Sequence, residues 1–367
     1  MTDEKKIRPM NDHSPLPGNV SLQPLIQHVM KGKPLDDRQM TVAMEMIMTG
    51  AASHVEIASF LTALSIKGET PEELVAAAAV MRRHARRLPA SCGICVDTCG
   101  TGGDGGRTFN VSTAAAIVAA AAGIRVLKHG NRSVSSQCGS ADVLEALQID
   151  IHQTPDEAAR LVNRKGMAFL YAPDYHQSMK HAAPVRKGLG FRTIFNILGP
   201  LVNPGAPARQ VVGVYDVNLL EPMAQALMAL GLQRALVVCG EDGLDELTTT
   251  GTSHVCEVGD GQLRRYTITP EMMGLKRSRA DEITGGDAAY NARIIREVFQ
   301  GTQPAARDLI ALNAGAVIYV VGRSDSLQEG VRKALQVLAD GRALAKLREL
   351  AEDSRTSGSA ERGASAC

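Results

Sequence analysis

The sequence predicts an α/β protein with two parts, a small all-helical N-terminal domain and a larger domain with a mostly parallel central sheet flanked by helices. Residues 21–88 carry helical periodicity and helix-capping signals throughout. From residue 93 onwards, short apolar runs alternate with segments of helix length. Strands separated in this way favour a parallel sheet with right-handed crossovers.

We expect four segments along the chain. In order they are a flexible N-terminal segment, the helical domain, the α/β domain and a disordered tail, at residues 1–20, 21–92, 93–354 and 355–367. Helices from about residue 174 to residue 198 are candidates to join the helical domain.

Composition argues against several classes of protein. The 367 residues are 44% hydrophobic, which is enough for a substantial core, and the net charge is +1. A nearly neutral chain without long charge blocks argues against a nucleic acid or a membrane surface as the main partner. The N-terminus lacks the apolar core of a signal peptide, and no run reaches transmembrane length, so we expect a cytoplasmic protein.

The seven cysteines do not form the framework of a disulfide-rich secreted protein, since they are odd in number and scattered. Cys92, Cys95 and Cys99 have a spacing that a metal site could use, but three thiolates without a nearby fourth ligand make a poor closed zinc site. We interpret them as reduced thiols. Cys99 and Cys138 lie in or beside the loops described below, which suggests sensitivity to oxidation.

The helical part contains four amphipathic helices. Apolar stripes at residues 25–29 and 40–47 belong to the first two, and the methionines among them indicate a core or a subunit interface rather than a cofactor site. Two capping boxes mark the starts of the last two helices: Ser53 with Glu56, and Thr70 with Glu73.

The larger domain opens with a strand and a glycine-rich loop. A short apolar run ending at Asp97 predicts a buried strand, and five glycines follow from Gly100 to Gly106. Glycines allow consecutive backbone N–H groups to converge on one anion. The next helix begins with polar residues and stops at Gly123, and its N-terminus also favours a phosphate group.

A second strand, loop and helix repeat this arrangement. The strand Ile124–Leu127 leads into a loop with two cations, Lys128 and Arg132, and the serine-rich residues 133–140 lead into another helix. Loops after neighbouring parallel strands meet at one edge of a sheet, so we expect these two loops to converge. The pattern is neither a P-loop nor a nicotinamide-binding glycine motif.

The rest of the larger domain continues the alternation. We expect, in order, a helix from Thr154 to about Lys165, a strand Met167–Tyr171, a helix opened by Pro173–His176 that bears Lys180, His181, Arg186 and Lys187, a strand Gln210–Tyr215, a helix Leu219–Leu230, a strand Ala235–Val238, a hairpin over Cys256–Thr267 and a helix over Pro304–Val321.

An acidic loop follows the strand Ala235–Val238. On sequence alone, Glu241, Asp242, Asp245 and Glu246 are all candidates for holding a cation, and a solvated acidic turn is the alternative. Phosphate and carboxylates at one edge of the sheet would repel each other without a divalent cation between them, so we predict magnesium. A pyrophosphate leaving group held in this way needs no nucleophilic side chain, and no motif of a serine hydrolase or zinc peptidase is present.

Four motifs together resemble the anthranilate phosphoribosyltransferase family of tryptophan biosynthesis: Gly100-Thr101-Gly102-Gly103-Asp104, Asn110-Val111-Ser112-Thr113, Lys128-His129-Gly130-Asn131 and Asp245-Glu246. The similarity extends from about Leu25 to about Leu350. It implies transfer of the phosphoribosyl group of phosphoribosyl pyrophosphate (PRPP) to the amine of anthranilate, with inversion at C1 of the ribose. It also implies a homodimer formed through the helical domain.

The resemblance implies three groups of site residues. PRPP would be bound by Gly100, Gly103, Asp104, Thr108, Asn110, Val111, Ser112, Thr113, Lys128, His129, Gly130, Asn131, Arg132, Ser133, Val134, Ser135, Ser136 and Ser140. Anthranilate would be bound by Arg186, which holds its carboxylate, and by Gly100, Asn131, His129 and His176. Two magnesium ions would be held by Ser112, Asp245 and Glu246.

Two other functions stay open at this point. A pyrimidine nucleoside phosphorylase shares the architecture, but its glycine loop has a different sequence from Asp97-Thr98-Cys99-Gly100-Thr101. A non-catalytic relative that binds nucleic acid would lack the acidic pair and carry a basic groove. One local departure from the family is Gln148, which stands where such helices usually end in glycine.

Overall fold

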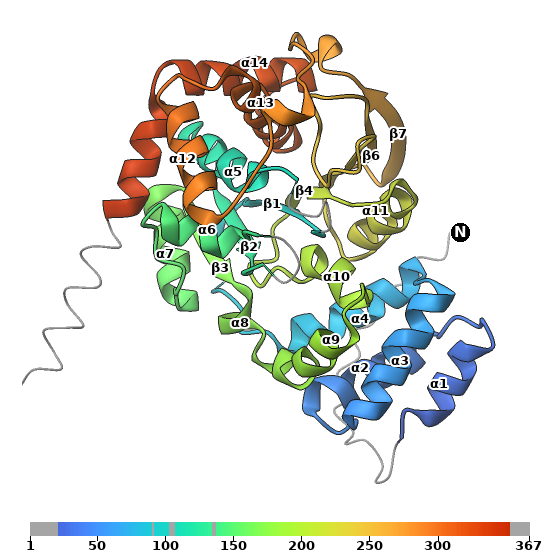
Figure 1. The fold of residues 1–367 in the computed structure, drawn as a ribbon. Helices are drawn as coiled ribbons and strands as arrows, with labels where there is room; N and C mark the ends of the chain where they lie inside the picture. The colour runs from blue at the N-terminus through green and yellow to red at the C-terminus, as the bar shows by residue number, and fades with distance from the viewer. Residues whose placement is uncertain (1–20, 90–91, 103–106, 134–136, 353–367) are drawn as a thin grey trace, which may run out of the picture.

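The computed structural model describes residues 21–89, 92–102, 107–133 and 137–352. It confirms the predicted fold class, with a helical lobe and a larger α/β lobe (Figure 1). The expectations for residues 1–20 and 355–367 lie outside the described residues. Within the described ranges no helix combines the length and the apolar character needed to cross a bilayer.

Four helices begin the helical lobe: α1 (Gln23–Met30), α2 (Asp37–Thr49), α3 (His54–Lys67) and α4 (Pro71–His84). Both predicted capping boxes are present in reciprocal form, at Ser53 and at Thr70. A third capping box, at Asp36, begins α2. Each box satisfies two backbone donors at a helix start, which explains why the sequence located these starts correctly.

The central sheet has seven strands in the order β3-β2-β1-β4-β5-β6-β7. The strands are β1 (Val96–Gly100), β2 (Val126–Gly130), β3 (Met167–Tyr171), β4 (Arg209–Gly213), β5 (Arg234–Gly240), β6 (Ser253–Gly259) and β7 (Gln262–Ile268). The first five are parallel, and β6 and β7 add an antiparallel edge with the predicted hairpin. The chain crosses from the edge strand β3 back to β4, so loops diverge at the carboxyl ends of β1 and β4.

The first two strands lie further along the chain than the sequence predicted. The predicted strand ended at Asp97, but β1 begins at Val96 and continues through Gly100. The second strand was expected to end at Leu127, but β2 includes Lys128 and reaches Gly130. Apolar character was the wrong criterion here, because these strand ends bury polar residues that have hydrogen-bond partners.

Helices cover both faces of the sheet. One face packs on α5 (Val111–Ala121), α12 (Ala288–Phe299), α13 (Pro304–Val320) and α14 (Leu327–Ala339). In Figure 1 these helices gather on one side of the strands, away from the helical lobe. The opposite face of β4–β6 packs on α11 (Leu220–Ala229), in a core that continues into α2–α4. The outer strand β3 is flanked by α7 (Pro155–Lys165), and α6 (Ser140–Ala146) follows the second loop.

The helix predicted from Pro173 onwards is instead a series of short helices. They are α8 (Ala172–Tyr175), η2 (Gln177–His181) and α9 (Ala183–Leu189), followed by α10 (Ile194–Leu198) and η3 (Gly199–Val202). Pro184 lies in the first turn of α9 and cannot continue a helix from η2, because it lacks an N–H and its ring would clash with the preceding turn. Val185 and Phe195 share a core with α2–α4, so this segment packs against the helical lobe.

Candidate active site at the carboxyl ends of the strands

The acidic pair after β5 meets the glycine loop and the start of α5. The backbone N–H of Gly102 donates to Asp245 Oδ2 at 2.8 Å. The backbone N–H of Ser112 donates to Glu246 Oε1 at 3.0 Å. Three segments that the sequence singled out separately therefore lie together at one edge of the sheet.

Two glycines make room for Asp245. A Cβ atom on Gly100 would lie 2.1 Å from Asp245 Oδ2, and one on Gly213 would lie 1.5 Å from the Asp245 carbonyl oxygen. Neither distance is compatible with a side chain. At Gly213 the obstacle is backbone, so glycine is required there, whereas a side chain at Gly100 would displace the Asp245 carboxylate from the Gly102 N–H.

The other two carboxylates of the acidic loop bond within that loop. Asp242 Oδ2 accepts from the hydroxyl of Thr248 at 2.6 Å and from that of Thr250. The exposed Glu241 accepts from the backbone N–H of Thr252 at 3.3 Å. The four carboxylates therefore differ in their hydrogen-bond partners: Asp245 and Glu246 bond distant segments, whereas Glu241 and Asp242 bond their own loop.

Lys128 reaches the same edge from inside the sheet. Its side chain is 1% exposed, and Nζ donates to the Thr98 carbonyl at 2.6 Å and to Ser112 Oγ at 3.2 Å. Val111 and Thr113 are buried in the first turn of α5 beside it. An ammonium and a helix N-terminus therefore face one another, which makes an environment suited to an anion.

The second loop is held by carboxylates of α6. Arg132 forms ion pairs with Asp142, at 3.0 Å, and with Glu145. Asp142 also accepts from the backbone N–H groups of Ser133 and Gly139, at 3.0 and 2.8 Å. The Arg132 guanidinium is thus engaged with the protein itself.

The end of β2 packs closely on the start of α6. A Cβ on Gly130 would lie 2.1 Å from Ser140 Oγ, and this hydroxyl donates to the Asn131 carbonyl at 3.3 Å. Gly130, Asn131 and Ser140 therefore bring the end of β2 into contact with the start of α6.

Asn110 links the start of α5 to two other segments. Its side-chain N–H₂ donates to the Cys138 carbonyl at 3.2 Å, and its oxygen accepts from Asn291 Nδ2 of α12 at 3.0 Å. Thr108 forms an isolated antiparallel bridge with Thr284. The segment before α5 is therefore anchored on both sides.

His129 and His176 are buried side by side, with ring centroids 5.2 Å apart. His129 Nδ1 donates to the Gly199 carbonyl at 3.2 Å, and His176 hydrogen-bonds the Val202 carbonyl. Burial lowers the pKa of His129 to about 3, aided by the neighbouring ring, and that of His176 to about 4. Among the described residues neither Nε2 has a hydrogen-bond partner, so two neutral imidazoles each present one unpaired nitrogen.

Arg186 lies in the last turn of α9 and is half-buried. Its guanidinium lies 5.4 Å from the ring centre of Phe195, and burial lowers the pKa of the group. Across residues 21–89, 92–102, 107–133 and 137–352 no carboxylate pairs with this guanidinium. A partly desolvated cation of this kind is suited to a carboxylate ligand.

Five of the predicted PRPP-binding residues cannot be placed. Gly103, Asp104, Val134, Ser135 and Ser136 lie outside the described residues. The predicted contacts of these residues with PRPP remain predictions.

The residues at this edge fit magnesium. The ion prefers hard oxygen ligands, and it is usually held by one or two carboxylates together with phosphate oxygens and water. Asp245, Glu246 and the Ser112 hydroxyl supply oxygen atoms on segments that touch one another. The described residues contain no cluster of three or more His, Cys, Asp or Glu suited to a metal.

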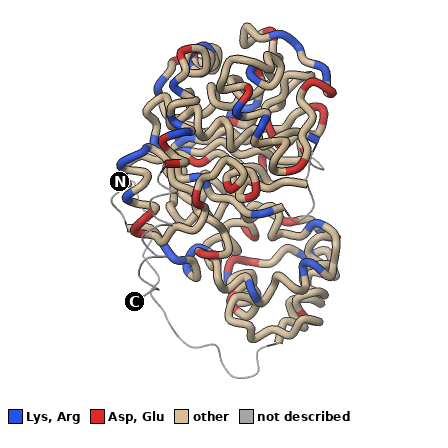
Figure 2. Tube along the Cα trace, turned by 60° about the vertical axis from the view of Figure 1, so that its left-hand side comes forward, with Lys and Arg blue, Asp and Glu red and all other residues tan. Residues whose placement is uncertain are grey.

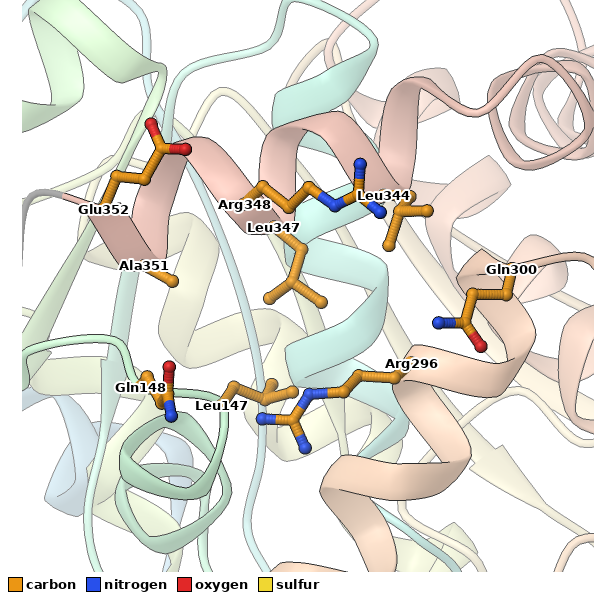
Figure 3. Close-up of a pocket in the computed structure, with 9 residues that line it drawn as sticks. All are labelled: Leu147, Gln148, Arg296, Gln300, Leu344, Leu347, Arg348, Ala351 and Glu352. Carbon is orange, nitrogen blue, oxygen red and sulfur yellow. The ribbon is translucent and has the colours of Figure 1, made fainter.

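A separate pocket of about 250 Å³ lies at the far end of α6 from Ser140 (Figure 3). It is lined by Leu147, Gln148, Arg296, Gln300, Leu344, Leu347, Arg348, Ala351 and Glu352. None of the predicted site residues lines it. Gln148 adopts the left-handed conformation, with φ of 66°, so the turn keeps the geometry expected of a glycine.

Sequence reasoning missed several buried amides that hold the site together. Asn203 and Gln210 donate to Asp97 at 2.8 and 3.4 Å, and Asn313 of α13 bonds both backbone groups of Leu247. Isolated Asn and Gln residues belong to no motif that could have identified them. Their burial and their distant partners are visible only in the folded chain.

Comparison with known proteins places both lobes in one family. The description "Glycosyl transferase family, helical bundle domain" matches residues 23–85, and "Glycosyl transferase family, a/b domain" matches residues 93–344. An anthranilate phosphoribosyltransferase from Brevibacillus brevis is 49% identical over 322 residues, which cover 88% of this chain and 94% of that protein.

Solved structures show the same similarity. The anthranilate phosphoribosyltransferase of Thermus thermophilus has a TM-score of 0.84 and 43% identity, covering 90% of this chain and 99% of that one. The Saccharomyces cerevisiae enzyme, solved in complex with PRPP and Mg, has a TM-score of 0.83 and 28% identity, covering 92% and 98%. The similarity therefore includes the helical lobe and the α/β lobe together.

Proposed function

This chain belongs to the anthranilate phosphoribosyltransferase family, and we propose that it transfers the phosphoribosyl group of PRPP to the amine of anthranilate, giving N-(5-phosphoribosyl)anthranilate and pyrophosphate. The observation that carries this proposal is the contact of Asp245 and Glu246 with the glycine loop and the start of α5. It joins anion-binding backbone to carboxylates that can hold magnesium, as a diphosphate donor requires.

In this proposal the donor diphosphate binds between the glycine loop, the α5 N-terminus and Lys128. Backbone N–H groups and the ammonium stabilise the negative charge that grows on pyrophosphate as the bond from C1 to oxygen breaks. Magnesium, held by Asp245, Glu246 and Ser112, would neutralise part of the diphosphate charge, and we propose two ions. No covalent intermediate is needed, because positioning and charge stabilisation suffice.

Arg186 would hold the anthranilate carboxylate and thereby present the amine to C1 of the ribose. The amine nitrogen attacks the face opposite the leaving pyrophosphate and then loses a proton, which gives inversion at C1. Gly100, Asn131, His129 and His176 would line the same site. The low pKa values of the two histidines keep both rings neutral, so they do not compete with Arg186 for the carboxylate.

We also propose a cytoplasmic homodimer formed through the helical lobe. Three apolar side chains on α1 and α3 are exposed: Met30 at 73%, Val55 at 75% and Ile66 at 83%. Burial of such residues in a symmetric contact would remove apolar surface from water. Light scattering tests the oligomeric state, and replacing Val55 and Ile66 with Lys should shift it towards monomer. We propose residues 21–92 as the helical domain and residues 93–354 as the α/β domain.

The activity is tested by incubating the protein with magnesium, PRPP and anthranilate and following the loss of anthranilate fluorescence. Turnover that stops on addition of a chelator is the expected result. Phosphorolysis of thymidine instead would favour a nucleoside phosphorylase, and tight DNA binding without turnover would favour a non-catalytic relative. In the view of Figure 2, basic and acidic residues are interspersed over both lobes, an arrangement that does not favour nucleic-acid binding.

A further inference from the structure

The strands β1 and β2 separate just before the candidate site. They are joined at a single residue pair, Val96 with Val126. By contrast, β1 pairs with β4 over five residues, and β2 pairs with β3 over five residues. Backbone groups on the facing sides of β1 and β2 must therefore find other partners, because a buried group without one costs free energy.

Side chains fill this gap. The His129 N–H donates to Asp97 Oδ1 at 3.3 Å, and Lys128 Nζ donates to the Thr98 carbonyl at 2.6 Å. Asn203 Nδ2 donates both to the Leu127 carbonyl and to Asp97 Oδ2, each at 2.8 Å. Asp97 is thus the shared acceptor in a set of contacts that replaces the strand ladder.

Asp97 is bonded as an ionised carboxylate. It is 0% exposed and accepts from Asn203, from Gln210 at 3.4 Å and from the Cys99 thiol, in addition to the His129 N–H. Burial raises the pKa of Asp97, and the charge of Lys128 is the first of several influences that oppose the rise. A carboxylate surrounded by donors offers only acceptor atoms, which is the pattern of the charged form.

The charge of Asp97 also bears on Lys128. Both side chains are buried, at 0% and 1% exposure, and a buried ammonium is costly without a nearby opposite charge. Lys128 Nζ lies 3.2 Å from Ser112 Oγ, at the edge where the donor diphosphate would bind. Loss of the Asp97 charge would remove part of the negative charge that compensates the ammonium at that position.

We propose that Asp97 is a positioning residue for donor binding, which acts through Lys128 and through the His129 N–H to hold the strand end against the diphosphate. This inference rests on the proposed function, since it takes PRPP as the donor. Asp97 does not touch the substrate. It sets where the ammonium and the start of the second loop lie.

The test is Asp97→Asn, which keeps the shape of the side chain and removes its charge. The Kd of PRPP with magnesium, measured by calorimetry in the absence of anthranilate, should rise about 10- to 100-fold, the usual cost of losing a hydrogen-bonded charged group. The KM for anthranilate should rise much less than the Kd of PRPP, because Asp97 reaches the residues that would line the anthranilate site only through the His129 N–H. In a Lys128→Met background the same substitution should have a smaller effect on the Kd, because one of the two groups through which Asp97 acts is gone and only the His129 N–H remains.

The helical lobe offers a matched control. Glu73 is likewise 0% exposed and accepts from two backbone N–H groups, those of Leu35 and Thr70, and from Lys67. Both Glu73→Gln and Asp97→Asn should lower the melting temperature, because each removes a buried, hydrogen-bonded charge, but Glu73→Gln should leave the Kd of PRPP unchanged. Equal effects of the two variants on PRPP binding, or an unchanged Kd in Asp97→Asn, would overturn the proposal.

Asn203→Ala covers the case in which Asp97→Asn does not fold. It removes one donor to Asp97 and keeps both charges, so a rise in the Kd of PRPP of about 3- to 10-fold is expected. A rise in the KM for anthranilate of the same size as the rise for PRPP would contradict the proposal. If the unaltered protein itself does not bind PRPP, the proposed function fails, and this outcome is distinct from failure of the positioning role.

Discussion

Four carboxylates occupy positions 241 to 246 of the loop after β5, and they have two kinds of partner. Asp242 accepts from hydroxyl groups of its own loop, Thr248 and Thr250. Asp245 and Glu246 accept from backbone N–H groups 143 and 134 residues earlier in the chain. The difference lies in what each carboxylate joins: Asp242 closes a turn, whereas the pair connects three separate segments.

This comparison shows why position in a motif does not identify a site residue. All four side chains have similar chemistry and lie within one short loop. Of the four, among the described residues, only the pair accepts from backbone N–H groups of the glycine loop and the α5 N-terminus, where Lys128 also lies. Substitutions in the two groups should therefore affect different properties, activity in one case and stability in the other.

The largest effect is expected for Asp245→Asn combined with Glu246→Gln. These changes remove the charges that would hold magnesium and keep the size of the side chains, so kcat/KM should fall at least about 100-fold. Steady-state kinetics across a magnesium titration measures this loss, and circular dichroism checks the fold. Activity close to that of the unaltered protein would show that the pair resembles Asp242 after all.

Two arginines differ in a similar way: one is paired with carboxylates of the protein, and the other is not paired with any carboxylate of the described residues. Arg132 forms ion pairs with α6, whereas Arg186 is half-buried beside Phe195. Arg186→Met should raise the KM for anthranilate about 10- to 100-fold with little change for PRPP, since it removes only the partner of the carboxylate. Arg132→Met should leave the KM for anthranilate nearly unchanged. An equal rise of both KM values in Arg186→Met would contradict its assigned role.

Local signals in the sequence were enough to predict the helical lobe. Capping boxes such as Ser53 with Glu56 depend on residues three positions apart, and the structure contains them as predicted. The ends of β1 and β2 were wrong because Thr98 and Lys128 are polar and yet buried, with the Lys128 ammonium bonded to the Thr98 carbonyl. A strand whose polar residues find partners across the sheet cannot be recognised from its own residues.

The long-range contacts of the site were beyond reach for a similar reason. The motifs indicated which loops carry the chemistry, and parallel topology indicated that they converge. Nothing in the sequence indicates that Asn203 bonds Asp97, since the two residues are 106 positions apart. Contacts of this kind depend on the complete packing of the chain.

Asp242→Asn tests the stabilising half of the comparison. Both threonine hydroxyls donate to the charged Asp242 carboxylate, and an amide at this position would weaken or lose these charge-assisted hydrogen bonds. The free energy of unfolding should therefore fall by about 1–3 kcal/mol. At saturating magnesium, kcat/KM should stay near that of the unaltered protein. Urea unfolding and kinetics on the same preparation measure both properties, and a large rise in the magnesium requirement would move Asp242 into the group with Asp245.

The smallest effect concerns His129 and His176, which combine both kinds of partner in one ring: Nδ1 bonds the protein and Nε2 is unpaired among the described residues. The pKa values of the two rings in the folded state, about 3 and about 4, lie below the ordinary value of 6.5. At a pH between these values and 6.5, the unfolded chain therefore binds more protons than the folded chain. Their stabilising contribution is therefore fully present above pH 6.5 and is lost as the pH falls towards 4. Urea unfolding at pH 7 and pH 5 should show a loss on the order of 1–2 kcal/mol for each ring. His176→Asn should reduce this pH dependence. Equal pH dependence in His176→Asn and the unaltered protein would mean that folding leaves the pKa of His176 near its ordinary value, which would contradict the expected effect of burial.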